Sequence, residues 1–361
     1  MQSSGPRGNE DHPSARFTNK PFEPFEEMSP KLITVFGATG AQGSSVLRSL
    51  ATNTSNQFAL RGTTRDPSSD SAKRISALGV ELVKADGWDI ASMVAAFKGS
   101  WGAFVNTNSD DPIFEDPGNT RTEVELGKLV VDAAIEAGVE VFVYSGFNSA
   151  KEITNGKVAN PAFDDKYAIG QYAKSTGAFK SVVLASPGDY FENFTHPDLA
   201  PVFGGFPFIP SEDGTLIFRS PKWGGKEDVP FISISDDYGD IVHGIFLDPE
   251  KWNGKLVQAV SDIRSWEDSI QAFERVTDKK ARFEEIPRWQ DFDTYGIRAL
   301  ETVKLMFGFC QESGGRYYGE ETEKHTAAGL KKAAAEARGL SDDQTKLLTL
   351  EEFFKREFVG K

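Results

Sequence analysis

Three glycines, Gly37, Gly40 and Gly43, lie in the segment TVFGATGAQGSSVL, between a short apolar run and a helical pattern. At this spacing the first glycine permits a tight turn after a strand, the second lets a pyrophosphate approach the backbone, and the third lets the next helix pack closely. The helix N-terminus then offers N–H groups and a positive dipole end to the phosphates. The segment therefore predicts a dinucleotide-binding turn. We assign to this turn Gly37, Thr39, Gly40, Ala41, Gln42 and Gly43.

Strand-like and helical segments alternate after residue 30, with runs such as KLITVFG, FALRGTT and VELVKAD between helical patterns. This alternation indicates parallel βαβ units and predicts an α/β fold, a Rossmann-type doubly wound parallel sheet. We expect this cofactor-binding lobe to span residues 30–195, with 229–262 returning to it. The aromatic loops of 196–228 and the helical patterns of 263–361 predict a smaller, mostly helical substrate or partner lobe. Residues 1–29, rich in Gly, Pro, Ser and charge, predict a flexible tail.

Composition excludes several classes of function. The 361 residues include 54 Asp and Glu against 40 Lys and Arg, and the net charge of -14 without a basic run argues against direct nucleic-acid binding. One cysteine and four scattered histidines give no support for a disulfide framework or a metal site. No apolar stretch approaches the roughly 20 residues of a membrane span. We therefore expect a cytoplasmic protein, either a monomer or a homodimer.

The next strand-like run, FALRGTT, is followed directly by Arg65. NAD-specific sites place a carboxylate near this position, which bonds the ribose 2′-hydroxyl and repels a 2′-phosphate, whereas NADP requires an arginine. Thr63 and Thr64 are neutral, so Arg65, with Arg61 as support, predicts NADP(H) as the cofactor. The alternative is that Arg65 is a solvated surface residue.

Polar residues also follow the later strand-like runs. Asp86 in ADGWD stands where an adenine amino group would be met, and Thr107 and Asn108 in VNTN stand beside the middle of the cofactor. Each of them is equally a turn-forming residue. Ser145 in VYSGF does not fit the Gly-x-Ser-x-Gly turn of a hydrolase, so we assign it to the lining of the cofactor site.

Several segments in the same order resemble the NmrA-like branch of the atypical short-chain dehydrogenase/reductases. They are TVFGATGAQGSSV, TTRDP, VYSGFNSAKEITNGKV, FDDK, PGDYFENF and VPFISISDDYGDIV. The resemblance implies an NADP-binding Rossmann lobe and a small C-terminal lobe. It assigns Lys166 to the nicotinamide ribose, and we add Tyr190 and Asn193 to the cofactor-binding candidates. It also implies either a sensor of the NADPH/NADP ratio that acts through a protein partner, or a reductase of quinones or other small molecules.

The usual catalytic acid of short-chain dehydrogenases is missing. Those enzymes use a tyrosine acidified by a lysine four residues later, but no tyrosine here has a lysine at that spacing, and Ala162 stands four residues before Lys166. If the site is catalytic, another group must supply the proton. The candidates are Tyr167, Asp165, Asp164 and the pair Tyr190 and Glu192. The segment YFEN is also explained by a purely structural role, as a wedge between the two lobes.

Three functions remain open. The first is an NADPH-dependent reduction of a bulky small molecule, aromatic or cationic in character, which would be an imine, iminium or quinone rather than a simple ketone. Candidate wall residues are Phe203, Phe206, Phe208, Trp223 and Trp289. The second is a redox sensor that regulates a protein partner. The third is non-redox acid/base catalysis of an amine condensation or cyclisation, since an acidic protein attracts a cationic amine.

Overall fold

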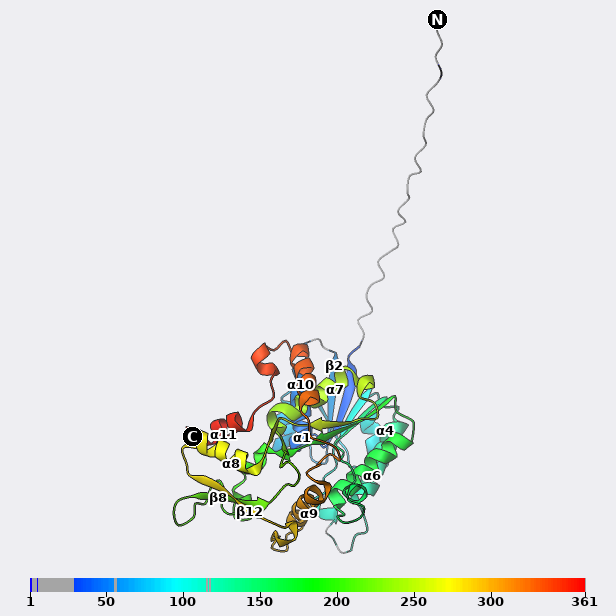
Figure 1. The fold of residues 1–361 in the computed structure, drawn as a ribbon. Coiled ribbons are helices and arrows are strands. Elements are labelled where there is room, and N and C mark those ends of the chain that lie inside the picture. The colour runs from blue at the N-terminus through cyan, green and yellow to red at the C-terminus, as the bar shows by residue number, and fades with distance from the viewer. Residues whose placement is uncertain (2–4, 6–28, 55–56, 115, 117, 361) are drawn as a thin grey trace.

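The computed structural model describes residues 1, 5, 29–54, 57–114, 116 and 118–360 (Figure 1). The predicted tail, residues 1–29, lies almost entirely outside these described residues. Among the helices that are described, none has the length and apolar character needed to cross a membrane. The described residues also contain no group of three or more His, Cys, Asp and Glu side chains arranged to hold a metal ion.

Seven parallel strands within the described residues form a central sheet, in the spatial order β10-β6-β5-β4-β1-β2-β3. They are β1 (Lys31–Phe36), β2 (Phe58–Thr64), β3 (Glu81–Lys84), β4 (Gly102–Val105), β5 (Val141–Tyr144), β6 (Ser181–Pro187) and β10 (Leu256–Ala259). The chain order reverses between β1 and β4, and at such a point the carboxyl ends of the strands open a crevice for ligands. This order confirms the predicted doubly wound sheet.

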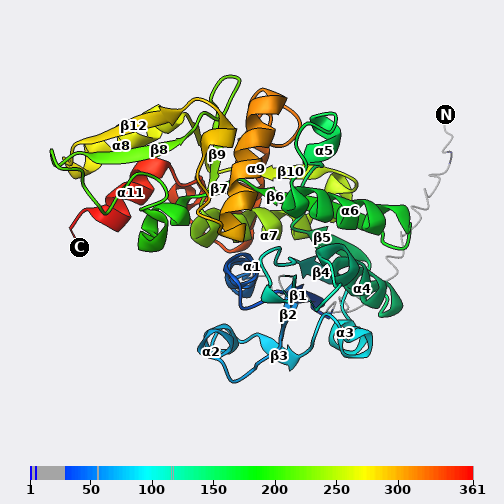
Figure 2. The same cartoon turned by 90° about the horizontal axis from the view of Figure 1, so that it is seen from below.

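Helices cover both faces of the sheet (Figures 1 and 2). One face carries α1 (Ala41–Ala51), α2 (Asp70–Ser76), α7 (Gly239–Leu247) and α10 (His325–Ala337). The other carries α3 (Ile90–Phe97), α4 (Glu123–Glu136) and α6 (Pro161–Ser175). Of the segment 229–262, α7 and β10 pack in this lobe, whereas β9 (Val229–Ile232) and β11 (Asp262–Arg264) do not join its sheet. The sequence analysis placed residues 263–361 in the smaller lobe, but α10, which belongs to that range, packs against α7 on the central sheet.

Capping residues set where α4 and α6 begin, and this positions two charged side chains of the site. Thr122 and Glu125 form a capping box at the start of α4, so that Glu123 is its first residue. The side chain of Asn160 caps α6, with Pro161 at the first position. Both helices therefore begin at the edge of the sheet where the carboxyl ends of the strands lie.

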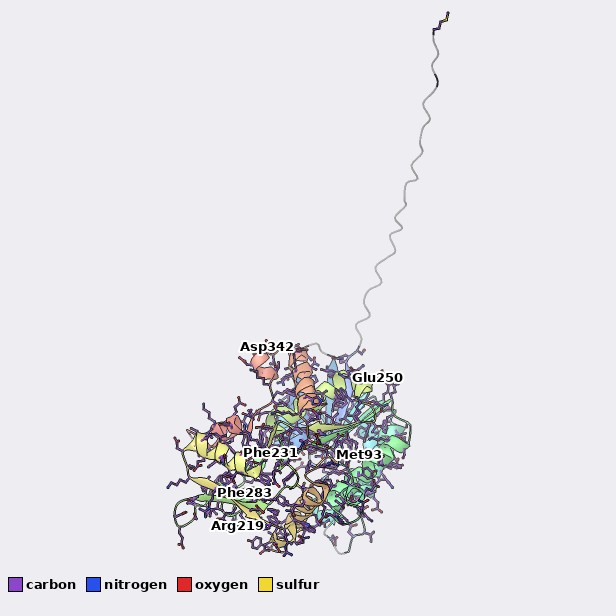
Figure 3. All side chains as sticks on the ribbon, viewed as in Figure 1. Met93, Arg219, Phe231, Glu250, Phe283 and Asp342 are labelled. Atoms are coloured by element: carbon purple, nitrogen blue, oxygen red, sulfur yellow. The ribbon has the colours of Figure 1, made fainter. Side chains whose placement is uncertain are left out.

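The smaller lobe contains a three-stranded sheet, a two-stranded sheet and an aromatic core within the described residues. Its elements are β7 (Asp189–Tyr190), β8 (Leu216–Pro221), β9 (Val229–Ile232), β11 (Asp262–Arg264), α8 (Trp266–Thr277), β12 (Ala281–Ile286), α9 (Arg298–Ser313) and α11 (Leu350–Phe358). β8 pairs with β12, and β9 lies between β7 and β11, so β9 does not return to the central sheet. Figure 3 marks Phe231 in the core of this lobe and Met93 in the core under α3.

Short helical segments connect these elements. They are α5 (Ala150–Ile153), the π-helical turn Ile234–Tyr238, and the 3-10 turns Pro112–Phe114, Phe191–Thr195, Pro197–Leu199, Pro249–Trp252, Trp289–Asp291 and Asp342–Thr345.

Candidate functional site

The glycine turn lies at the carboxyl end of β1, where the order of the strands reverses. Gly37 has a φ of +83°, which only glycine adopts readily, and Gly40 is the N-cap residue of α1. A Cβ atom on Gly43 would lie 2.2 Å from the carbonyl oxygen of Gly37. The close packing of turn against helix therefore requires glycine at position 43.

No contact among the described residues requires glycine at position 40. A Cβ atom on it would meet, among the described residues, only the carbonyl oxygen of Gly37, at an ordinary 3.4 Å. Its backbone angles of φ -79° and ψ 172° are open to any residue. No side chain caps the first turn of α1, and no acidic residue lies in it. This arrangement fits a pyrophosphate, because the backbone is open to close approach and the helix dipole favours an anion.

Residues that follow β2 and β3 border the same crevice. Arg65 comes directly after β2 with its side chain 73% exposed, and its one ion pair in the described structure is a long contact of 3.4 Å to Asp111. Asp86 lies just beyond β3, and its carboxylate accepts a hydrogen bond from the backbone N–H of Trp88. Both residues thus lie at the expected edge of the sheet. The contact of Asp86 with Trp88 is a turn contact, which is the alternative role that the sequence suggested for Asp86.

Arg61 does not lie at this edge. Its Nε donates to Glu81, and its Nη1 donates to the carbonyl oxygens of Ala96 and Lys98 at the end of α3, at 2.8 and 3.0 Å. The prediction that Arg61 supports a 2′-phosphate is therefore wrong, because its guanidinium is occupied in fastening β2 to β3 and α3.

Lys166 forms a buried cluster with Glu123 and Thr107 at the end of β4. Its ammonium group donates to Glu123 Oε1 at 2.5 Å, to the carbonyl oxygen of Thr107 at 2.7 Å and to Thr107 Oγ1 at 3.1 Å. Thr107 Oγ1 also contacts the Tyr144 hydroxyl at 2.9 Å. The side chains of Lys166 and Glu123 are only 9% and 3% exposed. Sequence reasoning missed Glu123, although the capping box beside it indicated that a helix begins there.

Asn108 and Ser145 lie beyond the carboxyl ends of β4 and β5. Asn108 follows β4, and its side-chain oxygen accepts the N–H of Asp110 at 3.2 Å, which is a turn contact. Ser145 follows β5 directly and is completely buried. Both positions agree with the predicted location at the carboxyl ends of the strands, while their contacts with a cofactor stay predictions.

Three of the candidate acids make contacts of a structural kind. Asp164 accepts hydrogen bonds from Ser149 Oγ and the Lys151 N–H. Tyr167 bonds to Glu152, which raises the pKa of its hydroxyl. Glu192 accepts the N–H groups of Ile234 and Ser235 and the hydroxyl of Ser235, which fastens the turn that follows β9. These contacts do not support Asp164, Tyr167 or Glu192 as proton donors.

Asp165 lies beside the lysine cluster, on the wall of an acidic cavity of about 260 Å³. We define this cavity by the residues that line it, which include Glu123, Ala162, Asp165, Arg298, Glu301 and Leu305. Burial, with the nearby charges of Glu123 and Asp164, raises the pKa of Asp165 to about 6. Ala162, four residues before Lys166, lines the same cavity as Asp165.

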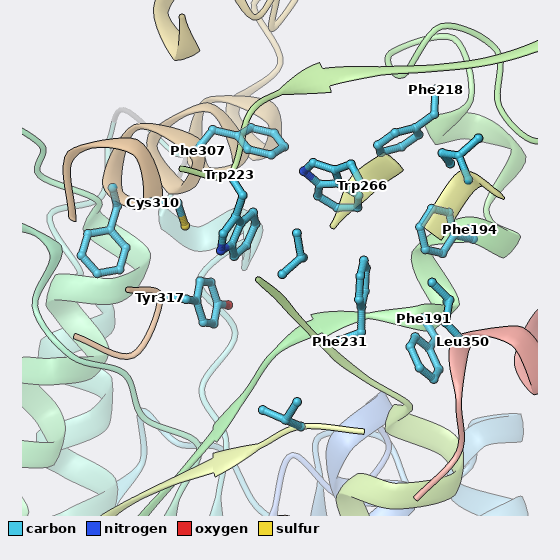
Figure 4. Close-up of a cluster of buried hydrophobic side chains, with 14 of the residues drawn as sticks. Phe191, Phe194, Phe218, Trp223, Phe231, Trp266, Phe307, Cys310, Tyr317 and Leu350 are labelled. Atoms are coloured by element: carbon cyan, nitrogen blue, oxygen red, sulfur yellow. The ribbon is translucent and has the colours of Figure 1, made fainter. Parts of the chain in front are cut away.

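The segment Asp189–Phe194 links the glycine turn with the smaller lobe. The Tyr190 hydroxyl accepts a hydrogen bond of 2.7 Å from Gln42 Nε2, and burial raises the pKa of Tyr190 to about 12. Phe191 and Phe194 are buried in the aromatic core (Figure 4). The segment thus contacts the glycine turn and also joins the two lobes, while a role of Tyr190 and Glu192 as proton donors stays a prediction.

A second cavity, the aromatic pocket, opens on the other side of this segment. Its volume is about 170 Å³. Its lining consists of Asp189, Asn193, Phe194, Leu199, Phe203, Phe206, Phe218, Trp266, Leu300, Val303, Met306 and Phe307. Figure 4 shows Phe307, Trp266 and Phe218 in a row, with Phe194 next to Phe218. A cavity of about 150 Å³ is known to accept a benzene ring, so this pocket has room for one aromatic group.

The predicted wall residues divide between four environments. Phe203 and Phe206 line the aromatic pocket. Trp223 is fully buried in the core, Trp289 lies over Gly308, and Phe208 is 42% exposed. Predictions for Trp223, Trp289 and Phe208 as pocket walls are therefore wrong, because the aromatic content of a loop does not show which rings face a cavity.

Helix α9 separates the acidic cavity from the aromatic pocket. Arg298, Glu301 and Leu305 face the first, whereas Leu300, Val303 and Phe307 face the second. This division follows from the spacing of three to four residues that places side chains on one face of a helix. A larger polar groove of about 780 Å³ runs along α1 and α10, but it contains none of the residues assigned to the site.

Comparison with known proteins agrees with this architecture. The model of the NmrA-like family matches residues 29–354. An NmrA-like family domain-containing oxidoreductase from Aspergillus hancockii is 49% identical over 329 residues, covering 91% of this chain and 97% of that protein. Another from Aspergillus flavus is 50% identical over 337 residues, covering 92% of this chain and all of that protein.

Solved structures show the same fold. The crystal structure of NmrA, a negative transcriptional regulator, in complex with NADP has a TM-score of 0.67 and is 22% identical. The likeness covers 92% of this chain and 96% of that one.

Proposed function

Because this chain belongs to the NmrA-like family, we propose that it is an NADP(H)-dependent oxidoreductase that reduces a bulky imine, iminium or quinone. The names of two relatives, 49% and 50% identical over nearly their whole length, support oxidoreductase chemistry. Bound NADPH supplies a hydride, so that for an imine the balance is C=N + NADPH + H⁺ → CH–NH + NADP⁺.

The observation that carries this proposal is the position of the aromatic pocket relative to the glycine turn. Tyr190 of β7 hydrogen-bonds to Gln42 of the turn, and the preceding residue, Asp189, lines the pocket. Neighbouring side chains of a strand point to opposite faces, so one short strand borders both the cofactor site and an apolar pocket. An apolar pocket with a few polar groups next to a cofactor site is typical of a substrate site.

The residues of the site have separate tasks in this proposal. The amide groups of the glycine turn and the N-terminus of α1 would hold the pyrophosphate, and Arg65 would hold the 2′-phosphate. Lys166, kept in place by Glu123 and Thr107, would orient the nicotinamide ribose. The aromatic pocket would exclude water from the apolar part of the substrate and orient it.

Simple ketones should be poor substrates. Ala162 stands four residues before Lys166 in place of the usual tyrosine, so a carbonyl oxygen would not meet a tyrosine–lysine pair. General acid catalysis contributes about 10²–10⁴-fold, so we expect cyclic imines, iminium ions and quinones to react at least about 100-fold faster than ketones. The measurement is NADPH absorbance with a panel of the three classes, combined with product analysis by mass spectrometry.

The same panel separates the alternatives. Comparable rates for ketones would contradict the proposal. Tight NADPH binding with inertness toward every substrate would favour a redox sensor that acts on a protein partner. Condensation or cyclisation products that form without NADPH consumption would favour non-redox acid/base catalysis.

Replacing Arg65 with alanine should remove most of the preference for NADPH over NADH. A charge-assisted contact between arginine and phosphate is worth about 1.5–3 kcal/mol, so NADPH affinity should fall about 10- to 100-fold while NADH affinity stays the same. Calorimetric titration of both cofactors measures this. Arg74→Ala, which removes the same charge from an exposed position of α2, is the control. Equal affinities of the unsubstituted protein for the two cofactors would show that Arg65 does not select NADPH.

A further inference from the structure

Asp189 is a carboxyl group without a cationic partner on the wall of the aromatic pocket. Its Oδ1 accepts one hydrogen bond, of 3.1 Å, from Asn193 Nδ2. Within the described part of the chain, no lysine, arginine or histidine forms an ion pair with Asp189. None of them is among the groups that shift its pKa either. Asp189 is half-buried, and a carboxylate partly removed from water is costly unless a cation or several hydrogen bonds compensate it, so this position lacks the partner that a purely structural carboxylate would have.

Among the described residues, four groups whose pKa values are affected by the charge of Asp189 are neutral at physiological pH. They are the hydroxyls of Tyr190, Tyr317 and Tyr318 and the thiol of Cys310 on α9. Burial raises the pKa of Asp189 to about 7, while the hydrogen bonds from Asn193 and the Tyr190 backbone act in the opposite direction. Asp189 is thus present both as an acid and as a carboxylate near neutral pH.

The walls of the pocket suit one type of partner for this carboxyl group. Six aromatic side chains line it, namely Phe194, Phe203, Phe206, Phe218, Trp266 and Phe307. Aromatic faces attract a cation that has lost its water, and their area binds an aryl group. A carboxyl group and aromatic faces in one small cavity together match a molecule that carries an aromatic ring and a basic nitrogen.

We propose that Asp189 binds the basic nitrogen of an aryl-substituted imine or amine in the aromatic pocket. This assignment rests on the proposed function, since it identifies the imine class within it. With a neutral imine, the O–H bond of the protonated carboxyl group breaks and an N–H bond forms on the imine nitrogen, so a carboxylate and an iminium ion result and no electrons are transferred. With an amine, the carboxylate accepts a hydrogen bond from the ammonium group.

Benzylamine is a suitable probe because it stays protonated between pH 6 and 8 and cannot be reduced by NADPH. We expect Asp189→Asn, which keeps the size and one oxygen acceptor, to weaken benzylamine binding at least about tenfold at pH 8, as loss of a charge-assisted hydrogen bond implies. Binding of benzyl alcohol, the neutral analogue, should change less than about twofold. Calorimetry on the full chain, with and without saturating NADP⁺, measures both. Asp343→Asn, at a side chain 96% exposed, is the control.

The pH dependence of the unsubstituted protein gives a second measurement, which needs no variant. Affinity for benzylamine should rise from pH 6 to pH 8 as Asp189 ionises, whereas affinity for benzyl alcohol should not. Equal affinities of the unsubstituted and Asp189→Asn proteins for benzylamine, or an equal loss for both ligands, would overturn the assignment.

The outcome for Asp189 is separable from that for the enzyme activity. Benzylamine binding that depends on Asp189, together with no NADPH oxidation by any imine, iminium ion or quinone of the panel, would leave the amine site standing and contradict the oxidoreductase. Imine reduction that is unaffected by Asp189→Asn would leave the oxidoreductase standing and contradict the assignment of Asp189.

Discussion

Replacing Gly40 with alanine should abolish NADP(H) binding and leave the protein folded. The added methyl group meets no described protein atom closer than 3.4 Å, and the backbone angles suit alanine. Alanine is a poorer N-cap residue than glycine but reduces the entropy of the unfolded chain, so the free energy of unfolding should change by less than about 1 kcal/mol. The methyl group would instead occupy the space into which the pyrophosphate must come, and NADPH affinity should fall at least about 100-fold.

Gly43→Ala is the matched variant, because it places the same methyl group one turn of helix further on. There the methyl would lie 2.2 Å from a backbone oxygen of Gly37, which cannot move aside without opening the turn. We expect the free energy of unfolding to fall by about 1–3 kcal/mol even without cofactor. Urea unfolding and calorimetric titration of both variants provide the comparison. Normal NADPH binding by Gly40→Ala would contradict the proposed position of the pyrophosphate.

Replacing Glu123 with leucine should be among the most destabilising changes to a charged residue of this protein. It leaves the ammonium group of Lys166 buried without its counter-ion, and breaking a buried ion pair on one side typically costs about 3–5 kcal/mol. The double variant Glu123→Leu with Lys166→Met should regain most of this loss, because no buried charge is left. It should still bind NADPH more weakly than the unsubstituted protein, since Lys166 is the group that we assign to the ribose.

An exposed ion pair provides the reference for this measurement. Lys157 and Glu312 are 2.9 Å apart, with side chains 67% and 31% exposed. Surface pairs contribute about 0–1 kcal/mol, so Glu312→Leu should have little effect on urea unfolding. A loss for Glu123→Leu no larger than that for Glu312→Leu would show that the lysine cluster does not depend on the ion pair.

Features encoded in a short segment are the ones whose location in the fold the sequence could indicate. The turn from Gly37 to Gly43 is one such segment, since the order of strand, glycines and helix is continuous in the chain. The position of Arg65 directly after β2 could be read in the same way, while its contact with a 2′-phosphate stays a prediction. Arg61 was misassigned because a strand has two ends, and only the packing of β2 against β3 and α3 shows that Arg61 lies away from the crevice.

Contacts between distant segments were not predictable in this way. Glu123 and Lys166 are 43 positions apart, and only the parallel sheet brings the start of α4 to α6. The sequence singled out Tyr190 and Glu192 but not Asp189. The aromatic rings that share a pocket with Asp189 come from β8, α8 and α9, which are distant in the chain. The same limit applies to α10, whose apolar face indicates a helix but does not identify α7 as its partner.

The position of α9 has a consequence for how proteins of this architecture can diversify. One face of the helix borders the acidic cavity beside Lys166, and the opposite face, with Leu300, Val303 and Met306, borders the aromatic pocket. Substitutions at these three positions would reshape the aromatic pocket without touching Glu301 or Leu305. On the proposed function, in which the aromatic pocket holds the substrate, substrate preference can therefore change along one side of a single helix while the residues on its other side stay the same.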